Sequence, residues 1–377
     1  MKPLLVIAGE ASGDLHGGEV LRALKDRSPE LRIVGIGGDR MSPFLDRKLA
    51  DVRDLGVIGF LEVLKHLPDL LRLKRDILQV AQEEHIGAAL FIDYPGFNLR
   101  MAKALREILP GVRLHQYVCP QVWAWKAGRI PHMGKVLDAI YCLFDFEPAL
   151  FAGHPVEALW VGHPLVEVVK PEVDRDTFFR EAGLDPARPV VALLPGSRKG
   201  EVDRLLPPMA ELIKTWRTEP SHKDVQWALA VAPTLSRSYL EARLDASAVT
   251  FVEDRSYALR AYADAALVCS GTATLETALL GTPFAILYRL NPFTYQMAKR
   301  LVTVPHFGLS NVVAGRAVSP EVLQHEVNPV RLGRELDRLL EPGHAARVRA
   351  ELLEVRKHLG QPGAADRVAE HLIRSMG

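Results

Sequence analysis

Asp93 has the position in this sequence that best suits acid–base chemistry. It directly follows the apolar run 88–92, which has the length and composition of a buried strand. A carboxylate at such a strand end lies partly desolvated at the mouth of a cleft, where it can act as a general base. The alternative role of Asp93 is to cap the helix that follows.

Glu10, Ser12 and Gly13 form a second candidate site, just after the apolar run 4–8. Small residues let another molecule approach the backbone closely, and an acid at a strand end points toward the edge where α/β sheets bind ligands. A tight strand-to-helix turn would explain the same stretch without a ligand.

Two later loops have the composition of anion-binding sites. Each follows a short apolar run and opens a helical pattern, so it offers backbone amides and the positive end of a helix dipole. Their residues are Gly196, Ser197 and Arg198 in the first loop and Ser270, Gly271 and Thr272 in the second. Glu276 lies about one helical turn beyond the second loop, within reach of a ribose diol. Because the sequence has no magnesium-binding P-loop, the two loops indicate a nucleotide-sugar whose diphosphate is held by dipoles and arginine.

Trp123 and Trp125 stand two residues apart, with Lys126 and Arg129 close behind them. Two aromatic rings with cations nearby would suit the wall of a sugar or base site. A pair of core aromatics is the commoner explanation of such spacing.

The composition excludes several classes of protein. The 377 residues contain 47 basic and 46 acidic side chains, so the chain lacks the basic excess that wholesale nucleic-acid binding requires. Three widely spaced cysteines disfavour a disulfide scaffold and a cysteine zinc site. The absence of a G-x-G-x-x-G motif removes the best support for a nicotinamide or flavin, so we expect neither cofactor nor metal. No signal peptide or spanning apolar stretch is recognised, which predicts a cytoplasmic protein.

Short apolar runs alternate with helical patterns along both halves of the chain, which is typical of βαβ units. The fold class is therefore α/β, with two doubly wound Rossmann-like domains facing across a cleft that is the expected ligand site. A proline-rich, charged break at 163–189 suggests the linker. We place the domains at 1–165 and 166–345, followed by a helical segment over 346–377.

The segment 56–75 carries apolar residues at helical spacing, with cations between them. The residues of interest are Phe60, Val63, Leu64, Leu67, Leu71 and Arg72. An amphipathic face on anionic lipid is one interpretation. On the residues alone, a pair of core helices around Pro68 is favoured.

Taken together, these segments resemble the lipid-A-disaccharide synthase family, bacterial glycosyltransferases of the GT-B fold. The resemblance rests on an ordered set of motifs across nearly the whole chain: GEASGD (9–14), PQVWAW (120–125), GHP (162–164), LPGSR (194–198), SGT (270–272), NPFT (291–294) and NVVAGR (311–316). The sequence departs from the family at Ser310, where the family usually has proline, and somewhat over residues 304–308.

The resemblance implies transfer of 2,3-diacylglucosamine from UDP to the 6-hydroxyl of 2,3-diacylglucosamine 1-phosphate, giving lipid A disaccharide 1-phosphate and UDP. Inversion at the anomeric carbon implies one direct displacement and no metal. Asp93 corresponds to the essential acid and is our choice of base. Arg198 corresponds to an arginine that steadies the diphosphate, and Asn311 to a UDP-side asparagine. We assign Glu276 to the ribose from helix geometry and from other GT-B enzymes.

The resemblance also implies a peripheral protein on the cytoplasmic face of the inner membrane, held there by an exposed apolar face within 56–75. The final helix is expected to return to the first domain, and a homodimer is a candidate assembly. Two other functions stay open. A UDP-sugar 2-epimerase shares the fold but needs no acceptor, and a non-catalytic lipid- or nucleotide-binding protein would release no UDP.

Overall fold

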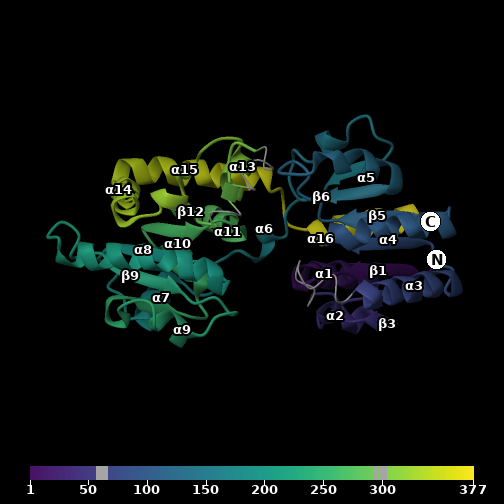
Figure 1. Cartoon of the computed structure of the whole chain (residues 1–377), viewed down its shortest axis with the longest axis horizontal. Coiled ribbons are helices and arrows are strands. Elements are labelled where there is room, and N and C mark those ends of the chain that lie inside the picture. Colours follow the sequence, from purple (N-terminus) through teal and green to yellow (C-terminus); the bar gives the residue numbers. More distant parts are fainter. Residues whose placement is uncertain (57–66, 292–294, 297–303) are drawn as a thin grey trace. The chain divides into compact units, whose positions relative to one another are not determined.

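The computed structural model describes residues 1–56, 67–291, 295–296 and 304–377. These residues form two compact units, one of Met1–Pro164 with Gly360–Gly377 and the other of Leu165–Leu359 (Figure 1). Phe60, Val63 and Leu64 lie outside the described residues, as does most of the NPFT motif.

The first unit is built on a parallel sheet in the order β3-β2-β1-β4-β5-β6-β7. Its strands are β1 (Leu4–Ala8), β2 (Ile33–Ile36), β3 (Arg47–Ala50), β4 (Ala88–Ile92), β5 (Arg113–Tyr117), β6 (Ala139–Cys142) and β7 (Glu157–Trp160). Its α-helices are α1 (Ala11–Arg27), α2 (Val52–Gly56), α3 (Leu67–Glu83), α4 (Pro95–Ile108), α5 (Ile130–Val136) and α16 (Ala364–Met376). Every residue of β1 and β4 is buried, because helices cover both faces of the sheet.

The second unit repeats this plan with the sheet order β10-β9-β8-β11-β12-β13. Its strands are β8 (Val190–Leu194), β9 (Gln226–Ala230), β10 (Thr250–Val252), β11 (Ala265–Cys269), β12 (Phe284–Tyr288) and β13 (Glu321–Leu323). Its α-helices are α6 (Leu165–Val168), α7 (Arg175–Ala182), α8 (Lys199–Thr218), α9 (Arg237–Glu241), α10 (Ser256–Tyr262), α11 (Thr272–Leu280), α13 (Leu309–Ala314), α14 (Pro329–Leu340) and α15 (Pro342–His358). Two parallel doubly wound sheets confirm the expected α/β class.

The strand order places a topological switch point in each sheet. In the first unit the chain runs outward from β1 to β3 and then crosses to β4, so the loops after β1 and β4 lead in opposite directions. In the second unit the same relation holds between β8 and β11. Ligands in such sheets bind at the carboxyl ends of the strands at these switch points. All four predicted site loops follow one of these four strands.

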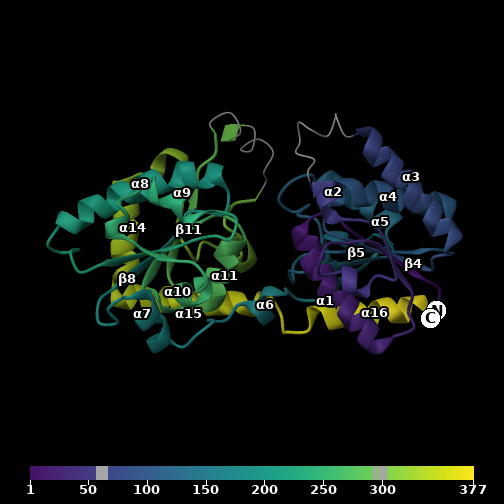
Figure 2. The same cartoon turned by 90° about the horizontal axis from the view of Figure 1, so that it is seen from below.

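The C-terminal segment divides between the two units. Helix α15 belongs to the second unit, and the chain re-enters the first unit at Gly360, so residues 346–359 do not share the unit of α16. Helix α16 runs beside α1 (Figure 2) and buries Val368, Ala369 and Leu372 in the core of the first unit.

A polar cluster also anchors α16. The Tyr141 hydroxyl lies 3.0 Å from Nδ1 of His115 and 2.9 Å from Nδ1 of His371. Ser375 donates its hydroxyl to the Leu372 carbonyl and lies 3.1 Å from Nε2 of His115. Nε2 of His115 must therefore carry the proton, which leaves Nδ1 to accept from Tyr141.

Candidate functional site

Asp93 lies in a strained turn at the end of β4. Asp93 and Tyr94 both adopt left-handed backbone conformations, with φ of 51° and 46°. Such conformations cost about 1–3 kcal/mol per non-glycine residue and gather at functional sites. Hydrogen bonds hold this turn in place: the Asp93 amide donates to the Tyr117 carbonyl at 2.9 Å, and Nδ2 of Asn98 donates to the Asp93 carbonyl at 2.8 Å.

The Asp93 carboxylate faces a residue of the other loop at the switch point. Ser12 Oγ donates to Asp93 Oδ2 at 3.4 Å, and the Tyr94 amide donates to Asp93 Oδ1 at 2.9 Å. The residue before α4 is Tyr94, and α4 has no side-chain cap, so Asp93 does not play the capping role. Helix α1 begins at Ala11, so Ser12 and Gly13 lie in its first turn and Glu10 directly precedes it.

His16 is a neighbour of Asp93 that was not predicted as a site residue from the sequence. It lies one turn along α1 from Ser12, which is the spacing that could have revealed it. Burial lowers the pKa of His16, and the charge of Asp93 partly opposes that shift. Burial, assisted by His16, lowers the pKa of His163 to about 3. The Asp93 carboxylate thus lies near the His16 imidazole, which burial keeps neutral.

In the second unit, Gly196, Ser197 and Arg198 form the loop between β8 and α8. Gly196 has a φ of 114°, and a Cβ there would lie 2.5 Å from Oε2 of Glu201, so this position requires glycine. Oε2 of Glu201 accepts from the amides of Ser197 at 3.0 Å and Arg198 at 3.2 Å. Oε1 accepts from the Arg198 guanidinium at 3.1 Å, while 84% of the Arg198 side chain stays exposed. The Glu201 carboxylate therefore accepts hydrogen bonds from the same backbone amides that we predicted would bind a ligand anion.

Ser270, Gly271 and Thr272 form the corresponding loop between β11 and α11. Ser270 donates its hydroxyl to the Phe307 carbonyl at 3.0 Å. Gly271 has a φ of 144°, and a Cβ built on it would meet no atom within 4 Å. Glycine is needed here for its conformation, and the space beside it is open at the start of α11.

Glu276 lies on α11 with a side chain that is 17% exposed. Its Oε2 pairs with the Arg260 guanidinium, and its Oε1 accepts from the Tyr257 hydroxyl at 3.2 Å. Burial and then the Glu276 charge raise the pKa of Tyr257 to about 12, so this hydroxyl stays a donor. The carboxylate is fixed by two donors, and any ribose hydroxyl would have to bind it alongside them.

Asn311 is fully buried and uses both ends of its amide inside the protein. Its Nδ2 donates to the Ser319 carbonyl at 2.8 Å and to Oε1 of Glu321 at 2.9 Å. Its Oδ1 accepts from the amides of Val318 and Ser319, each at 2.9 Å. The Glu321 carboxylate in turn accepts from the Phe307 amide, and the Phe307 carbonyl accepts from the Ser270 hydroxyl. This geometry makes Asn311 a positioning residue for the Ser270 loop.

The two tryptophans of the PQVWAW motif have different environments. Trp123 donates its Nε1 to Oε1 of Glu147 at 3.1 Å and packs edge-on against Phe144 and Phe146. Trp125 is 44% exposed, and the Lys126 ammonium lies 4.0 Å from the centre of its ring. One ring therefore fits the core interpretation and the other fits a surface site.

The parallel sheet brings together two cysteines that are distant in sequence. The Cys119 and Cys142 sulfurs and a Glu147 oxygen all lie within 4.8 Å of one another, and all three residues are buried. Such a group has the donor types of a metal site. Glu147, however, already accepts from Trp123 and from the amides of Leu143 and Phe144, and burial raises its pKa to about 7. A hydrogen bond with Cys142, followed by burial, raises the pKa of the Cys119 thiol, so protonated groups sharing hydrogen bonds are favoured here.

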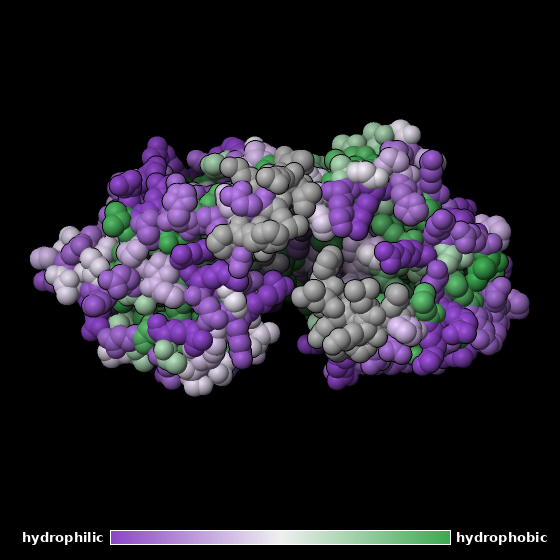
Figure 3. All heavy atoms as spheres, viewed as in Figure 1, coloured by the Kyte–Doolittle hydropathy of each residue, from purple (hydrophilic) through white to green (hydrophobic). Residues whose placement is uncertain are grey.

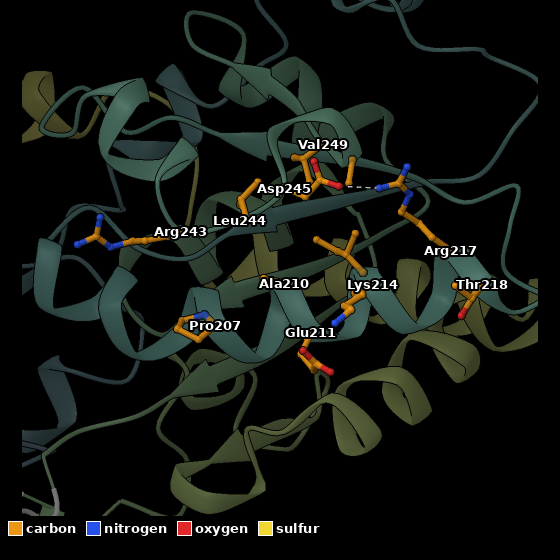
Figure 4. Close-up of a pocket in the computed structure, with 12 residues that line it drawn as sticks. Pro207, Ala210, Glu211, Lys214, Arg217, Thr218, Arg243, Leu244, Asp245 and Val249 are labelled. Atoms are coloured by element: carbon orange, nitrogen blue, oxygen red, sulfur yellow. Dashed lines mark hydrogen bonds and ion pairs between the residues drawn. The ribbon is translucent and has the colours of Figure 1, made fainter.

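A pocket of about 710 Å³ lies on the second unit, between α8 and the segment that precedes β10 (Figure 4). Pro207, Lys214, Arg217, Asp245 and Val249 are among its lining residues, and Arg217 pairs with Asp245 at 2.9 Å. The lining residues come from α8 and from the segment just before β10, at the end of the sheet where the strands begin. The predicted site loops lie at the other end, where the strands finish. The pocket lining therefore contains none of the predicted site residues.

The candidate membrane-facing residues are only partly described. Leu67 begins α3, Leu71 is 58% exposed, and Arg72 is exposed beside Asp69. Leu70, Leu73 and Ile77 of the same helix pack in the core, so α3 is amphipathic. On the face seen in Figure 3, apolar residues show among polar ones in the region of α3. None of the described helices has both the length and the apolar character needed to cross a membrane.

Comparison with known proteins assigns the family. A model of the lipid-A-disaccharide synthetase family matches residues 4–371. The lipid-A-disaccharide synthase of Geobacter sulfurreducens is 38% identical over 99% of this chain and 97% of its own length. That of Anaeromyxobacter dehalogenans strain 2CP-C is 40% identical, with the same coverage.

Solved structures with little sequence similarity share the fold. The glycotransferase of kitacinnamycin has a TM-score of 0.65 at 14% identity, covering 100% of both chains. UDP-GlcNAc 2-epimerase from Neisseria meningitidis, bound to UDP-GlcNAc, has a TM-score of 0.62 at 12% identity, covering 99% of this chain and 100% of its own. The family model and the close relatives go further than the fold: this chain belongs to the lipid-A-disaccharide synthase family, glycosyltransferases of lipid A biosynthesis.

Proposed function

We propose that the protein transfers 2,3-diacylglucosamine from its UDP derivative to the 6-hydroxyl of 2,3-diacylglucosamine 1-phosphate, with inversion at the anomeric carbon. The products are the β-1,6-linked disaccharide 1-phosphate and UDP. The observation that carries this proposal is the strained turn at Asp93, which holds a carboxylate at the switch point of the first sheet.

Asp93 acts as the base. Its carboxylate accepts the proton of the acceptor hydroxyl while that oxygen attacks the anomeric carbon, and the bond from this carbon to the UDP oxygen breaks. One displacement from the face opposite UDP inverts the configuration. The neutral imidazole of His16 supports this role, because it adds no positive charge beside Asp93 that would weaken the carboxylate as a base.

The second unit binds UDP in this account. Arg198 is exposed at the start of a long helix. Its guanidinium and the positive end of the helix dipole both stabilise the negative charge that develops on the departing diphosphate. The open space at Gly271 admits a ligand to the start of α11. Glu276, held by Arg260 and Tyr257, is the proposed ribose acceptor. These groups stabilise a leaving diphosphate without a metal.

We also propose that the protein works at the cytoplasmic surface of the inner membrane, where acylated substrates reside. The exposed Leu71 on amphipathic α3 supports this assignment. Leu71→Ser should weaken sedimentation with anionic liposomes. Leu353→Ser, at a similarly exposed leucine of the second unit, is the matched control. Equal sedimentation of both variants would exclude a role of Leu71 in membrane binding.

The reaction is tested by incubating the purified protein with UDP-2,3-diacylglucosamine and 2,3-diacylglucosamine 1-phosphate, with a chelator present, and following products by mass spectrometry. Disaccharide 1-phosphate and UDP in equal amounts are expected. Loss of the UDP-sugar without the acceptor would instead indicate the 2-epimerase or hydrolase reaction. No turnover would indicate a binding protein.

A further inference from the structure

Trp125 presents an exposed aromatic face accompanied by two cations. The Lys126 ammonium lies 4.0 Å from the ring centre, and the Arg129 guanidinium carbon lies 6.0 Å from it. Within the described part of the chain, neither cation pairs with a carboxylate. Cations without acidic partners beside an exposed tryptophan are available to an anionic ligand that also has an apolar face.

The loop that carries Trp125 is fixed from inside the first unit. Trp123 donates a hydrogen bond to the buried Glu147 carboxylate, which also accepts from the amides of Leu143 and Phe144. The Trp125 amide donates to the Gln121 carbonyl at 3.3 Å, and Lys126 adopts a left-handed conformation with a φ of 59°. The orientation of Trp125 toward solvent is therefore set by buried contacts two residues away.

The same loop is joined to the proposed base. It follows β5, the strand next to β4 in the sheet. Nε2 of Gln116 donates to the Asp93 carbonyl at 3.1 Å and to the Val118 carbonyl at 3.4 Å, so one side chain ties the Asp93 turn to the start of the Trp125 loop. A ligand bound at Trp125 would lie on the same side of the sheet as Asp93, at the carboxyl ends of the strands.

We infer that Trp125, Lys126 and Arg129 form the subsite for the phosphate-bearing sugar of the acceptor, an inference that rests on the proposed function. The indole ring supplies a flat face for the sugar ring, and the ammonium and guanidinium bind the phosphate oxygens. The acceptor is preferred over UDP as the occupant because this subsite shares a unit with Asp93. The loops suited to a diphosphate belong to the second unit.

The test compares two acceptors, 2,3-diacylglucosamine 1-phosphate and the same sugar without phosphate. In the double variant Lys126→Gln/Arg129→Gln, KM for the phosphorylated acceptor should rise about tenfold or more, because two charge-assisted contacts are lost. The KM for the UDP-sugar should stay unchanged, and the preference for the phosphorylated acceptor should disappear. Lys135→Gln, an exposed cation of α5, is the matched control and should behave as wild type.

One result would overturn the inference: a double variant that keeps the wild-type preference for the phosphorylated acceptor. If that variant also fails to sediment with phosphatidylglycerol vesicles, the two cations bind lipid headgroups instead. If the wild type makes no disaccharide, the proposed function fails separately. Binding of glucosamine 1-phosphate, measured by calorimetry on wild type and double variant, then decides whether the subsite exists.

Discussion

Ser12 and Asp93 belong to different loops of the first unit, and their side chains meet: the Ser12 hydroxyl donates to Oδ2 of Asp93 at 3.4 Å. Ser12 lies in the first turn of α1 and Asp93 follows β4, so the contact spans the switch point of the sheet. This contact orients a carboxylate whose backbone is already fixed in a left-handed turn. The position of the proposed base is thus set before substrate binds.

Ser12→Ala should lower kcat about three- to tenfold, because one long hydrogen bond to a charged group is lost. The melting temperature should stay within about 2 °C of wild type, since Ser12 is exposed and no buried group loses its partner. Steady-state kinetics with a parallel melt would check this. An unchanged kcat would mean that the turn alone orients Asp93.

Gly196→Ala should reduce activity and stability together. The added methyl would lie 2.5 Å from Oε2 of Glu201 in a backbone conformation that alanine avoids, at a cost of about 1–3 kcal/mol. It would also move Glu201 away from the Arg198 guanidinium. Urea unfolding with kinetics for the UDP-sugar provides the measurement. Gly111→Ala, where a methyl would meet no atom within 4 Å, is the control, and equal losses in both variants would contradict the explanation.

Asn311→Leu should destabilise the protein by about 2–4 kcal/mol, because the buried amides of Val318 and Ser319 and the Ser319 carbonyl lose their partners. Activity should fall as the Ser270 loop loses its support. The free energy of unfolding in urea is the deciding quantity. A variant of wild-type stability with a selective loss of UDP affinity would show that Asn311 contacts the nucleotide directly.

Acid should destabilise the first unit below about pH 6.5. Burial lowers the pKa of His115 and of His163 from 6.5 to about 3, so both are neutral when folded and become protonated when unfolded. Their contribution is complete above the unfolded pKa and is lost as pH falls toward the folded value. Glu147 changes stability with pH in the opposite direction. Burial raises its pKa to about 7, so its contribution to the free energy of unfolding is lost as pH rises. Two histidines outweigh one glutamate between pH 6.5 and 5.

The bond pattern around His115 explains why its neutral form is required. Nδ1 of the neutral ring accepts from Tyr141, and a protonated ring would place a charge inside this buried cluster and weaken the hold on α16. Unfolding free energies measured from pH 8 to pH 5 should therefore decline. A flat profile across this range would mean that the histidines are not buried as described.

The sequence predicted most of the interior strands and missed three others. The runs at 4–8 and 88–92 match β1 and β4, because buried strands of parallel sheets are continuous apolar runs. Strands β3, β7 and β13 escaped prediction because each is short and begins with a charged residue. Their residues, such as Arg47, Glu157 and Glu321, are partly exposed, so no apolar run marks them.

The candidate site was predictable as a set of loops, but the contacts of individual residues were not. Residue types at strand ends pointed to Asp93, Arg198 and Gly271. The buried bonds of Asn311 and the engagement of the Ser197 amide by Glu201 depend on side-chain positions that spacing does not encode. The same holds for Asp14 of the GEASGD motif, whose buried carboxylate accepts from the amides of Gly38 and Met41.

The central claim is that Asp93 is the base, and the most direct measurement is disaccharide formation by Asp93→Asn with both substrates at saturation. The amide keeps the shape of the carboxylate but cannot accept the proton, so kcat should fall by about 10²–10⁴-fold, the usual contribution of a general base. The affinity for UDP should stay within about threefold of wild type, since the variant leaves the UDP-binding loops intact. Asp39→Asn, at an exposed acid of the same unit, should retain full turnover. Near-normal turnover by Asp93→Asn would contradict the account.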